Sequence, residues 1–307
     1  MQRIRRAACT TALALACSMA LATSAAAREP LAGLALPALG EAANGETHPG
    51  KVIWADLVTP DLEAAEQFYA GLLGWRFKDL SAQGERYAVA LLDGQPVAGL
   101  LQRSMSQRAH RRPAWLTFIA VRDVDAATRN AQQRGAHVLA AARSFPDRGR
   151  QAILSDPQGA VFAVLASSSG DPPDVLPAIG DWIWSSLLTR DPGRDAAFYQ
   201  DLFAYDVFDQ DDGPAAGQLV LSTDDYARVG VSALPAAASH GHPHWLDFVR
   251  VADADAAAAR AVALGGKVLV APYAEEEGVR LAVVADPQGA TFGLMQWAPP
   301  AATAVSP

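Results

Sequence analysis

The sequence predicts an α+β fold in which four βαβββ units form two tandem domains. The main observation is an internal repeat: a shift of 130 positions places Trp54 on Trp184, and the sequence DPQGA at 156–160 on the same sequence at 286–290. The second observation is that both repeats alternate strand-like runs with stretches of helical periodicity. A period this long exceeds that of solenoid repeats, which indicates two whole domains.

The repeat extends over most of the chain. Further identical residues coincide at the same offset: Thr59 and Thr189, Asp61 and Asp191, Phe68-Tyr69 and Phe198-Tyr199, Trp115-Leu116 and Trp245-Leu246, Gly135 and Gly265. The offset slips once, near Gly99 and Gly230, which indicates a loop whose length differs between the repeats. The two copies are therefore expected to have the same order of elements.

Local patterns predict each element of the first repeat. Residues 52–59 are rich in β-branched and aromatic side chains, as strands are, and Asp61 can cap a following helix. That helix has an apolar face at helical spacing and stops at Gly74, which suits the left-handed backbone of a helix end. The remaining expected elements are strands at 75–80, 86–92 and 96–102, a strand at 115–121, a helix at 124–134, and strands at 137–145, 150–155 and 160–166.

The ends of the chain differ in composition from the repeats. Residues 1–27 combine three arginines with an Ala/Leu-rich run and close on small residues, which predicts an export signal peptide cleaved after Ala27. Cys17 offers an alternative, a lipid-anchored protein. The expected segments are a signal peptide at 1–27, a linker at 28–49, a first domain at 50–167, a linker at 168–180, a second domain at 181–298 and a tail at 299–307.

The balance of basic and acidic residues indicates which classes of partner the protein can bind. The chain has 25 basic and 33 acidic residues, and without residues 1–27 the balance is 22 against 33. A surface this negative repels phosphate backbones, so nucleic acid is not an expected partner. Beyond the signal peptide no run approaches about 18 apolar residues, so no membrane-spanning segment is expected in the mature chain.

The repeated DPQG sequence is typical of a turn. Asp, Pro and Gly at its first, second and fourth positions suit a type I turn, because Pro presets the backbone angle and Gly closes the turn. We expect DPQG to connect the last two strands of each domain. This role is structural and requires no catalytic function.

Two longer motifs, VTPDLEAAEQFYAGLLGW at 58–75 and SDPQGAVF at 155–162, resemble the vicinal oxygen chelate superfamily. Its members include glyoxalase I, extradiol dioxygenases, and the fosfomycin and bleomycin resistance proteins. The resemblance covers roughly residues 50–166 and 180–297. It implies that paired βαβββ units curl around a pocket, one in each domain. It specifies the fold and no particular activity, because one scaffold hosts several chemistries.

Enzymes of that superfamily generally bind a divalent metal through His, Gln or Glu side chains. The resemblance places these ligands at Trp54, Leu116 and Ala163 in the first domain and at Trp184, Leu246 and Gly293 in the second. The remaining ligand is expected on the last strand of the first unit, taken as 87–92 or 218–223, and neither segment contains an acid or a histidine. None of these side chains binds a cation, so no cofactor is expected and a divalent metal is disfavoured.

Two other groups are candidates for chemistry. Asp56 lies two residues after Trp54, so both side chains point to the same face of a strand, and Ser186 occupies the matching position in the second repeat. His242 and His244 can bind a transition metal through imidazole nitrogen. The alternative for these histidines is an exposed loop, which Pro243 between them favours.

Two functions remain open. The first is an exported protein that binds a small organic molecule in apolar pockets, with ligand-binding residues Trp54, Trp184, Ser186, Leu116 and Leu246. The second is a lyase- or dioxygenase-type enzyme of the same superfamily, which uses a metal through non-standard ligands or uses Asp56 as a general base. By analogy with single-domain relatives, the domains are expected to pack as an internal pseudo-dimer, with a homodimer as the alternative.

Overall fold

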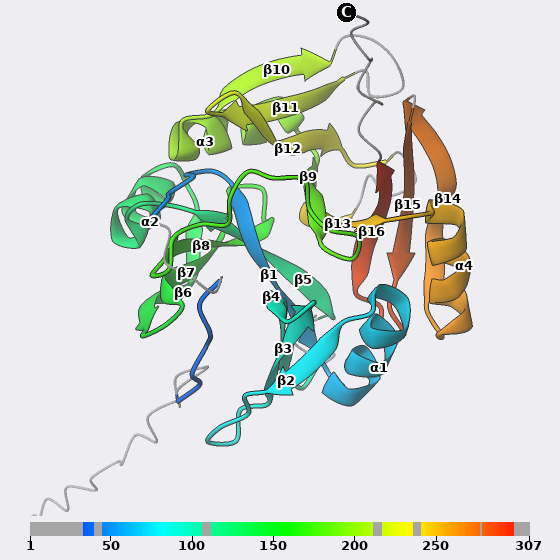
Figure 1. Cartoon of the computed structure of the whole chain (residues 1–307). Coiled ribbons are helices and arrows are strands. Elements are labelled where there is room, and N and C mark those ends of the chain that lie inside the picture. The colour runs from blue at the N-terminus through cyan, green and yellow to red at the C-terminus, as the bar shows by residue number, and fades with distance from the viewer. Residues whose placement is uncertain are drawn as a thin grey trace, which may run out of the picture.

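The computed structural model describes residues 33–39, 45–105, 112–210, 217–235, 241–276 and 278–297. In these ranges the chain forms two eight-stranded sheets and four helices (Figure 1). Each sheet combines two βαβββ units, as the repeat predicts. None of the helices in the described ranges is long and apolar enough to cross a membrane.

The first sheet has the strand order β2-β3-β4-β1-β5-β8-β7-β6. Its first unit comprises β1 (Val52–Thr59), α1 (Leu62–Leu73), β2 (Arg76–Asp79), β3 (Tyr87–Leu92) and β4 (Gln95–Gln102). Its second unit comprises β5 (Ala114–Ala120), α2 (Val124–Gln133), β6 (His137–Phe145), β7 (Gly149–Ser155) and β8 (Val161–Ser167). The first strands of the two units, β1 and β5, pair antiparallel at the centre.

The second sheet repeats this order as β10-β11-β12-β9-β13-β16-β15-β14. Its first unit comprises β9 (Trp182–Thr189), α3 (Pro192–Phe203), β10 (Asp206–Gln210), β11 (Gln218–Thr223) and β12 (Tyr226–Ala233). Its second unit comprises β13 (His244–Val251), α4 (Ala254–Ala263), β14 (Lys267–Glu276), β15 (Val279–Ala285) and β16 (Thr291–Trp297).

The ends of α1 follow from the residues that the sequence singles out. The side chain of Asp61 accepts a hydrogen bond from the amide of Ala64 at 3.1 Å, which satisfies one of the unpaired donors of the first turn. Gly74 ends the helix at φ 75°, a backbone conformation that side chains with a Cβ rarely adopt. In α3 the cap is Asp191, and Pro192 occupies the first turn, where its missing N–H costs nothing.

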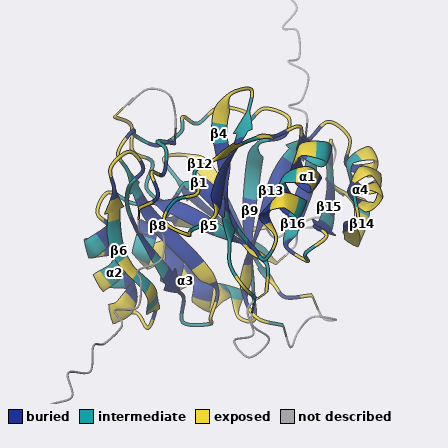
Figure 2. Cartoon of the chain, turned by 90° about the horizontal axis from the view of Figure 1, so that it is seen from below, coloured by how far each residue is buried: buried dark blue, intermediate teal, exposed yellow. Residues whose placement is uncertain are grey.

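The two domains share their hydrophobic cores crosswise. One core combines α1 and the strands of the first unit with α4 and the strands of the fourth, and includes Phe68 and Phe292. The other combines the second unit with the third, and includes Phe162 and Tyr199. Figure 2 shows the buried residues concentrated on the central strands, with exposed residues on the outer faces of α2 and α4. Burial of apolar surface between the domains therefore stabilises both.

A hydrogen bond joins the two domains at equivalent positions of the repeat. Thr117 and Asp247 are separated by 130 residues, the repeat offset, and the hydroxyl of Thr117 donates to Asp247 Oδ2 at 2.8 Å. The hydroxyl of Ser185 donates to the other carboxylate oxygen at 2.6 Å. Contact between equivalent residues of two copies is typical of an approximate two-fold axis, which lies between β5 and β13.

The DPQG sequences form the turns between β7 and β8 and between β15 and β16, as predicted. The amide of Gly159 donates to the carbonyl of Asp156 at 3.1 Å, which closes the turn. Oδ1 of the same aspartate accepts from the amides of residues 158, 159 and 160. Its Oδ2 accepts from the hydroxyl of Tyr199, which lies on α3 in the other domain. These turns are therefore also contacts between the domains.

Candidate functional site

Each sheet has one face that its helices leave uncovered. We call these faces the first cup, in the domain formed by β1–β8, and the second cup, in the domain formed by β9–β16. The first cup presents a cluster of large side chains from β1, β3, β5 and β8, which includes Trp54, Tyr87, Phe118 and Leu165. These apolar side chains need a cover, because exposed apolar surface of this extent is unfavourable in water.

Residues 33–39 cover the first cup. Leu34, Leu36 and Leu39 are almost fully buried there, and Leu36 is only 1% exposed. Arg148 holds this segment, because its Nε donates to the carbonyl oxygen of Pro37 at 2.7 Å. The sequence predicted a linker over 28–49; the structure instead packs part of it into the first domain, because its leucines match an apolar face. We call residues 33–39 the strap.

Asp56, Trp54, Tyr87 and Arg148 form a buried polar cluster in the first cup, in which both Nη atoms of Arg148 have no hydrogen-bond partner within the described residues. Asp56 Oδ1 accepts hydrogen bonds from Trp54 Nε1 at 2.7 Å and from the hydroxyl of Tyr87 at 2.9 Å. The guanidinium of Arg148 lies over the Trp54 ring, 4.0 Å from its centroid. Burial raises the pKa of Asp56, although the charge of Arg148 and the two hydrogen bonds act in the opposite direction. Asp56 therefore lies in a closed cluster beneath the strap.

The second cup is open and forms the wall of a cavity of about 1050 Å³. Trp184 and Ile183 are half-buried there, whereas their equivalents Trp54 and Ile53 are buried under the strap. The cavity also reaches the linker between the domains, Leu39 at the end of the strap, and parts of β1 and β4 that include Trp54 and Val97. Its aromatic and aliphatic lining includes Trp182, Trp184, Val220, Phe248, Leu281, Met295 and Trp297. A cavity of this size and character suits a small organic molecule.

Two polar side chains lie on the floor of the second cup. Ser186 Oγ accepts a hydrogen bond from Trp184 Nε1 at 3.0 Å. Gln218 approaches from β11, and both side chains lie above Gly230 on β12: a Cβ added to Gly230 would lie 2.4 Å from Gln218 Nε2 and 3.2 Å from Ser186 Oγ. Glycine at this position therefore leaves the space that the Gln218 amide occupies.

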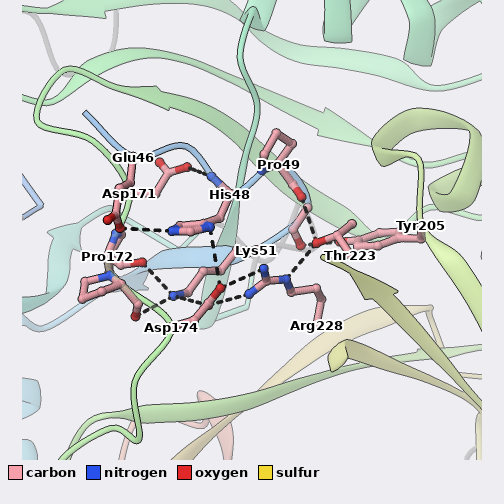
Figure 3. A network of polar contacts seen from close by, with 12 residues as sticks. Glu46, His48, Pro49, Lys51, Asp171, Pro172, Asp174, Tyr205, Thr223 and Arg228 are labelled. Carbon is pink, nitrogen blue, oxygen red and sulfur yellow. Dashed lines mark hydrogen bonds and ion pairs between the residues drawn. The ribbon is translucent and has the colours of Figure 1, made fainter. Parts of the chain in front are cut away.

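A network of charged residues forms one rim of the cavity (Figure 3). Asp174, in the linker between the domains, pairs with Lys51 at 2.8 Å and with Arg228 at 2.6 Å. Burial alone would raise the pKa of Asp174, but the hydrogen bonds and charges of Arg228 and Lys51 outweigh it and lower the pKa to about 2. Nearby, the amide of His48 donates to Asp171 at 2.6 Å. The network fixes the linker against both domains.

The residues at the expected metal positions do not fit a metal. Trp54 and Leu116 lie on neighbouring strands of the first cup, and Trp184 and Leu246 do so in the second, but none of them offers a ligand atom. Gly293 lies against Phe248: an added Cβ would be 2.0 Å from the ring. Within the described ranges, no three His, Cys, Asp or Glu residues are placed to hold a metal ion.

One step of the sequence comparison needs correction. The segments 87–92 and 218–223 are β3 and β11, not the last strands of their units. The last strands are β4 and β12, where Gly99 pairs with Asp56 and Gly230 pairs with Ser186. The error arose because each of these segments is followed by one further strand of the same unit. The corrected positions are glycines and provide no metal ligand either.

The other predicted residues lie apart from the cavity. His244 begins β13, and its Nδ1 is 2.9 Å from the carbonyl oxygen of His242, a contact within the same loop. Their role as a metal-binding pair stays a prediction. Leu246 packs in a cluster with Phe248 and Leu281, and Leu116 packs at the edge of the first cup's cluster. The predicted signal peptide and Cys17 lie outside the described residues.

Comparison with known proteins identifies the family. Residues 51–164 match the glyoxalase/bleomycin resistance protein/dioxygenase superfamily, and residues 184–295 match a glyoxalase-like domain. CFP32 of Mycobacterium tuberculosis, provisionally named a glyoxylase, is 34% identical over 83% of this chain and 97% of its own length. The chain belongs to this superfamily. The anthracycline biosynthesis protein DnrV of Streptomyces peucetius is a further relative, 31% identical over 81% of this chain and 94% of its own length.

Solved structures of this superfamily share the fold. The Mn(II)-bound glyoxalase from Novosphingobium aromaticivorans superimposes with a TM-score of 0.55 at 16% identity, over 81% of this chain and 82% of that chain. Homoprotocatechuate 2,3-dioxygenase from Brevibacterium fuscum superimposes with a TM-score of 0.57 at 14% identity, over 88% of this chain and 85% of that chain. At such low identity the likeness extends to the architecture alone.

Sequence reasoning missed three features of the site: the strap, Arg148 and Gln218. The segment 218–223 considered for a metal ligand begins with Gln218, which falls on Tyr87 at an offset of 131, as Gly230 falls on Gly99, but the segment was searched only for an acid or a histidine. The strap had no such signal, because nothing in a short Leu/Ala-rich segment specifies the surface that it covers.

Proposed function

We propose that this superfamily member is exported and binds one small organic molecule per chain in the second cup. The observation that favours this site is the contrast between two equivalent faces of one molecule. The first cup is covered by the strap and its carboxylate, Asp56, is hydrogen-bonded to Trp54 and Tyr87, whereas the second cup borders a cavity of about 1050 Å³ lined by aromatic and aliphatic side chains. Burial of an apolar ligand surface there is favourable.

A matched pair of substitutions tests the assignment to the second cup. We expect Phe248→Leu to weaken the binding of naphthalene, a flat neutral probe, because Phe248 lines the cavity and contributes aromatic contact area. Phe118→Leu changes the equivalent residue in the first cup, which is not among the lining residues of the cavity, and it should lower the melting temperature without a comparable loss of affinity. Isothermal titration calorimetry of both variants measures affinity and stoichiometry. Loss of affinity in Phe118→Leu alone would contradict the proposal.

An enzyme is the second candidate function, and the buried carboxyl of Asp56 is the observation that favours it. A carboxyl whose pKa is raised by burial can serve as a general base. The provisional glyoxylase name of the relative CFP32 points in the same direction. The strap argues against this role, because its leucines pack in the cluster of Trp54 and Tyr87, where Asp56 is buried. Loss of turnover in Asp56→Asn with naphthalene binding retained would support the enzyme.

Export rests on the composition of residues 1–27. Expression of the full-length chain in a Gram-negative host, followed by N-terminal sequencing of the product, tests the proposal. Cleavage after Ala27 would support free export. A product that begins at a lipid-modified Cys17 would contradict free export and would support anchoring of the protein to a membrane.

A further inference from the structure

The floors of the two cups differ at two equivalent pairs of positions. Asp56 and Tyr87 in the first cup correspond to Ser186 and Gln218 in the second, as the pairing of their strands with Gly99 and Gly230 shows. In the first cup the carboxylate accepts from the phenol at 2.9 Å, which pairs the two groups. In the second cup a hydroxyl and an amide replace this ionisable pair, so neither of these two positions carries a charge.

The hydroxyl and the amide of the second cup both have hydrogen-bonding capacity left over. Ser186 is 94% buried, with 6% of its surface exposed, and its oxygen accepts from Trp184 Nε1, so the hydroxyl proton remains available. No hydrogen bond joins the Gln218 amide to another side chain or backbone group in the described part of the chain, and the amide borders the cavity together with Ser186. Gln218 is half-buried, so its amide is accessible from the cavity, and a ligand with a hydrogen-bonding group can pair with both side chains.

The charges around the cavity disfavour an anionic ligand. Lys51 and Arg228 are the cations among its lining residues, and both pair with Asp174. The other ionisable side chains of the lining are acidic: Asp171, Asp181, Asp247 and Glu275. A carboxylate or phosphate placed on the floor would therefore find no cation that lacks a partner, and it would lose its hydration.

We propose that the second cup selects a neutral aromatic molecule with a hydroxyl or carbonyl group, which Gln218 and Ser186 bind while Trp184 and Phe248 contact the ring. This inference rests on the proposed function and adds the chemical class of the ligand. Gln218 and Ser186 act as specificity-determining residues. The amide can donate to the ligand oxygen or accept from it, and the serine proton can donate to it, so phenols and ketones both fit.

Three probes of similar shape test the inference on the mature full-length protein: naphthalene, 2-naphthol and 2-naphthoate at pH 7. We expect 2-naphthol to bind roughly 5- to 10-fold more tightly than naphthalene, which corresponds to one to two net hydrogen bonds. We expect 2-naphthoate to bind more weakly than 2-naphthol. In Gln218→Leu the preference for 2-naphthol should disappear while naphthalene retains its affinity. Gln133→Leu, at an exposed position on α2 that does not line the cavity, should change neither.

The outcomes separate this inference from the function on which it rests. Binding of naphthalene with equal affinity for 2-naphthol would overturn the inference and leave the small-molecule function intact, as would 2-naphthoate binding as tightly as 2-naphthol. Failure of all three probes to bind would overturn both. If Gln218→Leu does not fold, Ser186→Ala replaces it, with the same expected loss of preference. A preference that persists in the folded variants would contradict the role of these residues.

Discussion

The hydroxyl of Tyr69 donates a hydrogen bond to Oδ2 of Asp286 at 3.3 Å, although the two residues are 217 positions apart. Tyr199 makes the equivalent bond to Asp156 at 3.0 Å. In both cases the tyrosine lies on the first helix of one domain and the aspartate begins the DPQG turn of the other. The chain therefore repeats both the Phe-Tyr and the DPQGA sequences because each side of the approximate two-fold interface needs one of each.

Removal of either hydroxyl should destabilise the protein. Tyr199→Phe leaves Oδ2 of the buried Asp156 without its tyrosine donor, and we expect the free energy of unfolding to fall by roughly 1–3 kcal/mol. Urea denaturation measures this change, and Tyr226→Phe, at an exposed tyrosine, is the control. In the double mutant with Asp156→Asn, the two losses should not add, because the residues are in contact. Additive losses would mean that the bond contributes little.

The carboxyl of Asp247 makes the stability depend on pH. Burial raises its pKa to about 6, against the hydrogen bonds from Ser185 and Thr117. Between about pH 4 and pH 6 the folded state therefore holds a proton that the unfolded state has lost, so stability falls as the pH rises. Asp247→Asn removes the cost of burying the charged carboxylate. We therefore expect the free energy of unfolding of this variant to exceed that of wild type by roughly 3 kcal/mol at pH 8 and by almost nothing at pH 4.

Chemical denaturation of wild type and Asp247→Asn at both pH values checks this prediction. Asp209→Asn, at an exposed position of β10, serves as the control and should behave as wild type. A variant that is less stable than wild type at pH 8 would show that the charged carboxylate of Asp247 is stabilising.

The strap should contribute to the stability of the first domain without affecting the second cup. Leu36→Ala removes a side chain that is 1% exposed, so we expect the free energy of unfolding to fall by roughly 2–4 kcal/mol. Leu139→Ala, at a leucine that is 55% exposed, should cost less than about 0.5 kcal/mol. Naphthalene affinity should be unchanged in both variants. An effect on stability no larger than that of Leu139→Ala would show that the strap does not pack in solution.

The ion pairs at the rim should respond to acid in the opposite direction to Asp247. The lowered pKa of Asp174, about 2, means that its stabilisation is present above about pH 4 and is lost as the pH falls toward 2. Asp174→Asn should therefore destabilise the protein at pH 7, by roughly 1–3 kcal/mol, because Lys51 and Arg228 lose their shared partner. Asp255→Asn breaks an exposed pair with Arg280 and should cost about 0.5 kcal/mol or less.

The sequence was sufficient to predict the architecture, because local patterns specify each helix and strand and because these patterns occur twice. The bounds of β1 and the caps of α1 follow from the β-branched run, Asp61 and Gly74. The candidate site was harder to predict, because its features depend on contacts between segments that lie far apart in the sequence. No residue near Leu36 in the sequence indicates that this segment covers the first cup. The spacing of Tyr69 predicts only that it lies on the apolar face of a helix, and does not predict its hydrogen bond to an aspartate of the other domain. Trp184 and Ser186 are in contact on one strand, and their role in ligand binding stays a prediction, whereas Gln218 was passed over because its segment was searched only for an acid or a histidine.

The most direct test of the ligand site is a crystal structure of the mature protein with 2-naphthol. Our account predicts electron density for one molecule in the second cup, with its ring against Trp184 and Phe248 and its hydroxyl within hydrogen-bond distance of Gln218. Residues 33–39 should remain in the first cup. Density for the probe in the first cup, with the strap displaced and the second cup empty, would contradict the account.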